Sequence, residues 1–382
     1  MAVKISRRGS IPPFIVMDVL RAANERAAAG GDVLHLEVGQ PSTAAPEWVI
    51  RSAEEALRSD NLGYTEALGL SELRSRLAQF YRARYGVTVP SERIVITTGS
   101  SGAFLLAFLA AFDAGDKVAL TAPSYPAYKN ILSALGIEAI EIPVGEETHF
   151  QPTPEVLAKY AGTIDGLIVA SPSNPTGSML TPGALEAVDR WCATNGVRFV
   201  SDEIYHGITY GTPAKTALAS GSPAIVVNSF SKYFSMTGWR LGWMVVPSDL
   251  IRSIECLAQN LFVAPPTLSQ LAALAVFDCL DELDDNVARY ARNRALLLEQ
   301  LPRAGFRRIA PPDGAFYLYA DVGHLTNDSS EFCRRMLNEI GVAATPGIDF
   351  DIARGNQTVR FCYAGSEADT IAAAERLKEW LK

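Results

Sequence analysis

Lys232 has neighbours that could support covalent chemistry with a carbonyl compound. It ends the segment Ser-Phe-Ser-Lys (residues 229–232), directly after the β-type run Ile225–Ser229, and Arg240 follows eight residues later. A lysine amine forms an imine when its surroundings lower its pKa, and hydroxyl and guanidinium groups bind phosphate. The segment therefore has the parts of an imine-forming lysine beside an anion site. A lysine on a surface loop is the simpler explanation when the segment is considered alone.

An acidic residue closes another strand-like run. Asp202 ends the run Arg198–Asp202 and is followed by Glu203-Ile204-Tyr205. A carboxylate at the end of a buried strand is costly unless it is paired, and a cationic ring nitrogen would be a suitable partner. Asp202 could equally cap a following helix, which is a common role for aspartate.

Two loops complete the set of candidate functional segments. Residues 98–102, Thr-Gly-Ser-Ser-Gly, lie between a predicted strand and a predicted helix, where small residues and free N–H groups favour phosphate. An ordinary turn with a helix cap would have the same composition. Residues 174–177, Asn-Pro-Thr-Gly, form a stiff loop that could hold the Asn174 amide in one place, or they could be a structural turn.

The elements that must position these segments alternate between strand and helix. A buried helix is predicted over Gly102–Phe112, and further helices over Ala127–Leu135 and Leu185–Thr194. This alternation predicts a mostly parallel seven-stranded sheet flanked by helices, in which ligands bind beyond the carboxyl ends of the strands. The predicted strands are Ile94–Thr98, Lys117–Thr121, Ala139–Ile142, Leu167–Ala170, Arg198–Asp202, Ile225–Ser229 and Trp243–Val246.

The pattern changes near both ends of the chain. Residues 1–45, with a helix over Phe14–Ala29, are predicted to be an arm and part of a small domain. Residues 46–285 would form the large domain. Residues 286–382 would form a smaller α+β domain. Its predicted elements are Asn286–Leu301, Gly314–Asp321, Ser330–Ile340, Thr358–Tyr363 and a last helix from Glu367.

Composition excludes several classes of function. The 382 residues carry a formal net charge of −8, which argues against nucleic-acid binding. The most apolar run, Ala103–Phe112, is too short to span a bilayer. The five cysteines are scattered and show no Cys-x-x-Cys spacing, so we expect no metal site and reduced thiols in the cytoplasm. No Gly-x-Gly-x-x-Gly follows the first strands, which disfavours a nicotinamide dehydrogenase.

The four segments occur in order, each at the end of a predicted strand. Together they resemble the class I/II aminotransferases, which are fold-type-I pyridoxal-phosphate (PLP) enzymes related to aspartate aminotransferase. The resemblance covers essentially the whole chain. It also rests on Gly39, Tyr64 before Gly69-Leu70, Pro123-Ser124-Tyr125-Pro126 and Thr358-Val359-Arg360-Phe361.

The resemblance implies a role for each of these residues. Lys232 would form the Schiff base with PLP, and Asp202 would keep its ring nitrogen protonated, so that the ring acts as an electron sink. Asn174 and Tyr205 would bind the phenolic oxygen of PLP, and Tyr125 would lie against the ring. Other residues would hold the phosphate or the substrate. The phosphate would contact Gly99, Ser100, Ser101, Ser229, Ser231, Arg240 and Tyr64 of a second subunit; the substrate would contact Arg360, Asn174 and the Gly39 backbone.

By the same resemblance the chain is a homodimeric aminotransferase with shared active sites. It would move an amino group between an amino acid and a 2-oxo acid by a ping-pong mechanism. A carbon–sulfur β-lyase, a decarboxylase or a cyclopropane-forming synthase on the same fold stays open as an alternative. A PLP-sensing transcription regulator is disfavoured because the chain has no room for a DNA-binding module.

The sequence departs from the pattern of aspartate aminotransferase at two points. No second arginine is identifiable for a distal substrate carboxylate. Tyrosine stands at position 125, where close relatives of aspartate aminotransferase often have tryptophan.

Overall fold

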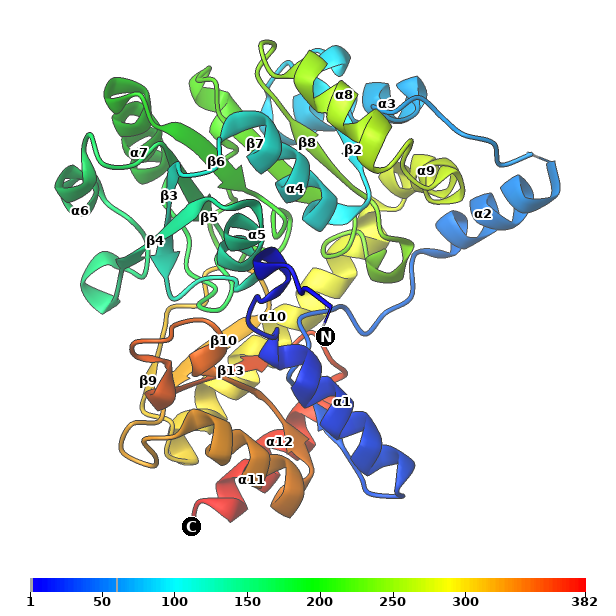
Figure 1. The fold of residues 1–382 in the computed structure, drawn as a ribbon. Coiled ribbons are helices and arrows are strands. Elements are labelled where there is room, and N and C mark those ends of the chain that lie inside the picture. The colour runs from blue at the N-terminus through cyan, green and yellow to red at the C-terminus, as the bar shows by residue number, and fades with distance from the viewer. Residues whose placement is uncertain (1–2, 60) are drawn as a thin grey trace.

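The computed structural model describes residues 3–59 and 61–382, which build a seven-stranded sheet and a separate four-stranded sheet (Figure 1). Strand β7 is buried along its whole length, as expected for a strand that helices cover on both faces. The order of the large sheet is β2 (Ile94–Thr97), β8 (Gly242–Val245), β7 (Ile225–Ser229), β6 (Arg198–Asp202), β5 (Gly166–Ala170), β3 (Lys117–Ala122) and β4 (Glu138–Pro143).

Only β8 runs against its neighbours in the large sheet. It pairs antiparallel with both β2 and β7, whereas β7, β6, β5, β3 and β4 pair in parallel. Because two reversals cancel, β2 points the same way as β7. The carboxyl ends of the parallel strands and the start of β8 therefore meet at one edge of the sheet.

Helices cover this sheet and fix the loop that follows β2. Helix α4 (Gly99–Ala111) lies against β7 and β8, and α8 (Ile251–Leu261) packs on α4. A Cβ on Gly242 would lie 2.8 Å from the carbonyl carbon of Gly99 and from the nitrogen of Ser100. Glycine at position 242 therefore lets the first turn of α4 touch the start of β8. The other helices of this part are α2 (Glu47–Ser59), α3 (Ser71–Tyr85), α5 (Ala127–Leu135), α6 (Pro154–Leu157), α7 (Pro182–Asn195) and α9 (Thr267–Ala273).

The four-stranded sheet belongs to the C-terminal part of the chain. Its order is β12 (Thr345–Pro346), β13 (Thr358–Cys362), β10 (Tyr317–Asp321) and β9 (Arg308–Ile309), with every pairing antiparallel. Helix α10 (Leu280–Arg303) runs between the two sheets, and α11 (Ser329–Ile340) and α12 (Glu367–Trp380) lie beyond the small sheet (Figure 1).

The N-terminal segment joins this C-terminal part. Strand β1 (Leu34–His35) pairs in parallel with β11 (Val342–Ala343), and α1 (Ile15–Ala28) packs against β11 and β12. Residues more than three hundred positions apart therefore share one structural unit. Figure 1 shows α1 in blue beside the orange and red elements.

The fold class is confirmed as an α/β fold with a mostly parallel seven-stranded sheet flanked by helices. The start of one helix differs from the prediction. Helix α4 begins at Gly99 rather than Gly102, so the glycine-serine loop is itself the first helical turn. The predicted domain boundary at residue 285 falls inside α10. The three-part division of the chain stays a prediction. No helix in the described part of the chain is long and apolar enough to cross a membrane.

Candidate active site

A cavity of about 430 Å³ opens at the edge of the large sheet where the strand ends meet. It collects most of the residues that the sequence singled out, although they come from segments as far apart as residues 39 and 360. The predicted residues that line it are Gly39, Ser100, Ser101, Tyr125, Asn174, Asp202, Tyr205, Ser231, Lys232, Arg240 and Arg360.

Lys232 follows β7 and extends its amine into this cavity. The Nζ atom donates a hydrogen bond to the carbonyl oxygen of Gly39, and it lies 5.8 Å from the ring centroid of Tyr205. Burial, helped by the positive charges of Arg360 and Arg240, lowers the pKa of the Lys232 ammonium to about 8. A substantial fraction of this amine is therefore neutral, and so nucleophilic, near physiological pH.

Asp202 is buried at the end of β6 and is held by two donors. The Tyr128 hydroxyl donates to Oδ2, and the backbone N–H of Ile204 donates to Oδ1 at 3.0 Å. Burial raises the pKa of the Asp202 carboxyl to about 6, while both hydrogen bonds and the charge of Lys232 oppose that rise. The carboxylate is thus mostly ionised at neutral pH and faces a cavity that could take a cationic ring.

The anion end of the cavity forms where α4 begins. Gly99 has φ +69°, and a Cβ there would lie 2.4 Å from Nη2 of Arg240, so glycine lets the guanidinium approach the helix start. Thr98 at the N-cap makes no side-chain capping hydrogen bond. Free N–H groups, a helix dipole and a guanidinium together favour a phosphate. The hydroxyls of Ser101, Ser231 and Thr237 line the same cavity.

Arg360 is a buried cation whose hydrogen-bond acceptors are all neutral. Its guanidinium donates to the Asn174 side-chain oxygen at 2.9 Å, to the Glu37 carbonyl and to the Thr345 hydroxyl at 3.2 Å. Arg360 is 2% exposed, and within the described part of the chain its Nε has no hydrogen-bond partner. The rings of Tyr317 and Phe350 lie 4.5 and 4.7 Å from the guanidinium carbon. An anionic ligand would offset the cost of burying this unpaired positive charge.

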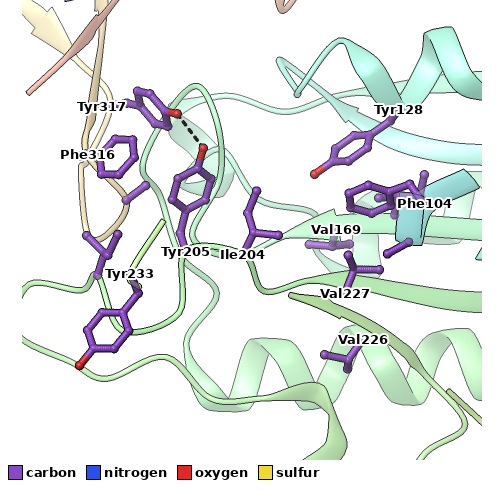
Figure 2. Close-up of a cluster of buried hydrophobic side chains, with 14 of the residues drawn as sticks. Phe104, Tyr128, Val169, Ile204, Tyr205, Val226, Val227, Tyr233, Phe316 and Tyr317 are labelled. Carbon is purple, nitrogen blue, oxygen red and sulfur yellow. Dashed lines mark hydrogen bonds between the residues drawn. The ribbon is translucent and has the colours of Figure 1, made fainter. Parts of the chain in front are cut away.

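Four polar or aromatic residues complete the walls. The Asn174 oxygen is taken by Arg360, which leaves the NH2 group of that amide as a donor. The hydroxyls of Tyr205 and Tyr317 lie 2.6 Å apart, and Figure 2 shows them facing each other. The Tyr125 ring packs edge-to-face between Phe14 and Tyr128.

Three predicted residues do not line the cavity. Gly99 lies behind it and makes room for Arg240. Ser229 is buried, and its hydroxyl accepts a hydrogen bond at 3.0 Å from the Ser231 N–H, so it shapes the lysine loop. Tyr64 lies in the loop after α2 and is 87% exposed. In a single chain, Tyr64 is therefore not part of the site.

Sequence reasoning missed several residues of the site. Tyr128 follows Tyr125 by three positions at the start of α5, and this helical spacing is the signal that could have found it. Tyr317 and Phe14 come from segments whose meeting with the large sheet leaves no local trace in the sequence. Thr237 lies between Lys232 and Arg240, in a segment where the sequence pattern indicates only the lysine and the arginine.

Comparison with known proteins agrees with this geometry. The model of the family "Aminotransferase class I and II" matches residues 31–377, so the chain belongs to that family. It is 51% identical to the valine–pyruvate aminotransferase of Mycobacterium tuberculosis, over 100% of this chain and 99% of that protein. It is also 33% identical to the aspartate/prephenate aminotransferase of Thermus thermophilus, over 97% of each chain.

Solved structures give the same result. An aminotransferase from Mycobacterium tuberculosis superposes with a TM-score of 0.97 at 51% identity, covering 100% of this chain and 99% of that one. The aspartate aminotransferase of Thermus thermophilus with maleate superposes with a TM-score of 0.92 at 31% identity, covering 99% and 100%. The protein is therefore an aminotransferase of a PLP-dependent family, which confirms the resemblance and the predicted reaction class.

The lowered pKa of Lys232 predicts how the protein without cofactor reacts with added PLP. An imine forms from the neutral amine, whose fraction rises as the pH increases through about 8, rather than through the usual 10.5. The initial rate of adduct formation, followed by absorbance, should rise up to about pH 8 and then level off. Lys232→Ala, which leaves only the other lysines, is the control. A rate that keeps rising to pH 10 in the wild type would contradict the perturbed amine.

Proposed function

We propose that this aminotransferase moves the amino group of a neutral, apolar amino acid to a 2-oxo acid, with PLP bound at Lys232. The observation that carries the proposal is the buried guanidinium of Arg360, which has neutral acceptors only and faces the same cavity as the Lys232 amine. An amino acid supplies the missing anion through its α-carboxylate, next to an amine that can exchange with the substrate amine.

The described residues fit PLP at three points of its structure. The first turn of α4, Arg240 and the hydroxyls of Ser101 and Ser231 suit the phosphate, and the Asp202 carboxylate suits a protonated ring nitrogen. Tyr205 and the free NH2 of Asn174 suit the phenolic oxygen. When bound, PLP carries the amino group between the two half-reactions and draws electrons away from the substrate Cα.

Lys232 and Asp202 would have different roles in the reaction. Lys232 would hold the cofactor covalently and, once released by the substrate amine, move a proton from the substrate Cα. Its lowered pKa suits that task, because a fully protonated amine cannot accept a proton. The hydrogen bond from Tyr128 helps to keep Asp202 ionised, so that its negative charge persists opposite the ring nitrogen.

Arg360 would bind the α-carboxylate of every substrate. The rings of Tyr317 and Phe350 hold its guanidinium plane, and Asn174 and Thr345 fix its direction. A planar guanidinium held in this way suits a bidentate pair with a carboxylate.

Apart from Gln40, the remaining lining of the cavity is largely apolar and favours an apolar side chain. The basic groups among its lining residues are Lys232, Arg240 and Arg360, and each has a role assigned above. Among the residues that the structure describes, no further arginine lines the cavity to receive a distal carboxylate. The 51% identical valine–pyruvate aminotransferase supports a small aliphatic amino acid as donor and pyruvate as acceptor. The apolar residues are Phe14, Val16, Met17, Leu20, Val38, Ala170 and Ile204.

We also propose that the active unit is a cytoplasmic homodimer. The anion end of the cavity is open in the single chain, because Ser101 and Arg240 are both exposed there. Exposed Tyr64 is an aromatic hydroxyl without a place in its own site, and a second copy could bring it to this opening. Cysteines 192, 256, 279, 333 and 362 are all unpaired, which suits a reducing compartment.

A half-reaction screen tests the substrate class. The PLP form is mixed with single amino acids, and the loss of its absorbance is followed. Valine and alanine should react at least about tenfold faster than aspartate or glutamate, because a second carboxylate would be buried unpaired. Lys232→Ala and the charge-conserving Lys232→Arg should both fail to react. Release of sulfide and pyruvate from cysteine, without amino transfer, would support the β-lyase instead.

Arg360→Leu should weaken every amino acid substrate by a similar factor. Removing one member of a desolvated charge pair costs on the order of 2–5 kcal/mol, which lowers kcat/KM roughly 30-fold to several thousand-fold. Arg360→Lys keeps the charge without the planar fork, and so should lie between the wild type and Arg360→Leu. A loss confined to acidic substrates would place Arg360 at the side-chain pocket.

Mixed dimers test whether Tyr64 serves the partner's site. Homodimers of Tyr64→Glu should bind PLP poorly because the new carboxylate repels the phosphate, and homodimers of Lys232→Ala should be inactive. In a mixed dimer both defects fall on one site, and the other site is intact, as an isologous interface requires. Differentially tagged, purified mixed dimers should therefore have roughly half the activity of the wild-type dimer, because one of their two sites is intact. Mixed dimers as inactive as both parents would show that Tyr64 does not act across subunits.

A further inference from the structure

Helix α1 begins without a cap from its own sequence. Its N-cap residue is Phe14, which has no side-chain acceptor for the first free N–H groups of the helix. The acceptor comes from Asp349, more than three hundred residues later. Its Oδ1 accepts from the Ile15 N–H at 3.1 Å, and its Oδ2 accepts from the Val16 N–H at 3.2 Å.

This cap is buried, unlike most helix caps. The Asp349 side chain is 4% exposed and follows strand β12 in a short 3-10 turn, Gly347–Asp349. A carboxylate at a helix N-terminus also interacts favourably with the helix dipole, and more strongly where water is excluded. Asp349 therefore fixes where α1 starts relative to the small sheet. The far end of α1 is held to the same unit, because Arg26 donates to the Asn338 carbonyl at 3.1 Å.

The first turns of α1 form the outer apolar wall of the substrate cavity. Phe14, Met17 and Leu20 line it at the three-residue spacing that places side chains on one face of a helix. The ring of Phe14 meets the ring of Tyr125 edge-to-face at 5.6 Å. Apart from the packing of α1 on β11 and β12, few buried side chains hold this wall: Met17 is 51% exposed, and the buried residues of α1 are Val16 and Ala23.

The same turn also reaches the proposed carboxylate-binding residue. Asp349 is followed directly by Phe350, whose ring lies 4.7 Å from the guanidinium carbon of Arg360. The Phe350 carbonyl accepts a hydrogen bond at 3.1 Å from the Ser124 N–H, which comes just before Tyr125. One short segment therefore sets the distance between the carboxylate-binding group and the wall that faces the substrate side chain.

We propose that Asp349 is a positioning residue that favours apolar substrates long enough to reach the α1 wall, such as valine, over shorter ones, by holding the first turns of α1 over the substrate cavity. The inference rests on the proposed function, because it names what selects the substrate at that site. Asp349 itself does not line the cavity and takes no part in the chemistry. Its effect passes through Phe14, Met17 and Leu20.

The variants Asp349→Ala and Asp349→Asn test this role. Alanine removes both acceptors, whereas asparagine keeps one neutral acceptor. Asp328→Ala is the matched control: Asp328 caps α11 by accepting from the Ser330 and Glu331 N–H groups, both at 3.0 Å, and does not line the cavity. The holoenzymes are compared by hydrogen exchange over residues 14–20. They are also compared by half-reactions with valine and alanine, and by calorimetric binding of isovalerate and acetate.

Asp349→Ala should expose the first turn of α1 to hydrogen exchange. It should also raise the apparent Kd of valine about fivefold, a ratio that corresponds to the free energy typically lost when a helix loses its N-cap. Alanine and acetate, which are too short to reach the wall, should change less than twofold. The maximal half-reaction rate should hold, because Lys232 and Asp202 are untouched. Asp349→Asn should lie between the wild type and Asp349→Ala. Asp328→Ala should change neither exchange in α1 nor the valine-to-alanine ratio.

Two results would overturn the inference. Faster exchange in α1 with an unchanged valine-to-alanine ratio would make Asp349 a purely structural cap. A changed ratio without faster exchange would mean that Asp349 acts through charge rather than position. The binding assay separates this inference from the proposed function. If the wild type transaminates neither amino acid, the proposed function fails, and the ratio of isovalerate to acetate binding still decides whether Asp349 positions an apolar wall.

Discussion

A buried cation without a protein anion is the constraint on which the rest of the site depends. Burying the Arg360 guanidinium among neutral acceptors is unfavourable by itself, since hydrogen bonds replace only part of the lost hydration. The fold tolerates this because two aromatic rings, an amide and a hydroxyl hold the group in one plane. The same neighbours leave its plane fixed at the place where we propose that the substrate carboxylate binds. Stability is thus given up at a proposed binding site, as is common at functional sites.

The charged groups near Arg360 also have pKa values that burial shifts away from their usual range. Lys232 is close enough to Arg360 and Arg240 for their charges to help burial in lowering its pKa, and the Asp202 carboxyl is shifted the opposite way by its own burial. At neutral pH the Lys232 amine is therefore partly neutral, and the Asp202 carboxylate is still mostly ionised. Tyr128 contributes to the second effect by donating a hydrogen bond to Asp202.

Sheet topology brings these groups together. The reversal of β8 between β2 and β7 returns β2 to the common direction, so that the start of α4 lies beside the lysine loop. Arg240 precedes β8 and reaches the same edge because that strand runs the other way. The close contact between Gly242 and the Gly99–Ser100 backbone then fixes the anion end. The substrate end depends on the other unit, where β13 carries Arg360 and the 349–350 turn anchors α1.

The sequence by itself determined the local parts. The apolar runs predicted the strands of the large sheet within a residue or two at each end, and Lys232, Asp202 and Asn174 could be named because each follows such a run. Local pattern could do this because strand burial and turn chemistry leave signals within a few residues. The sequence predicts the start of this helix at Gly102, three residues after its observed start at Gly99, because a glycine-serine segment is weakly helical until the tertiary fold holds it.

Only the tertiary structure decided which distant segments complete the site. Nothing near Tyr317 predicts that its hydroxyl meets that of Tyr205, and no motif links Asp349 to the start of α1. These contacts arise where the C-terminal unit meets the edge of the large sheet and where the N-terminal segment returns to the C-terminal unit. Such packing depends on shape and burial summed over the whole chain. The sequence therefore determined which groups could do the chemistry, and the tertiary structure decided their surroundings, their acidity and the shape of the pocket they face.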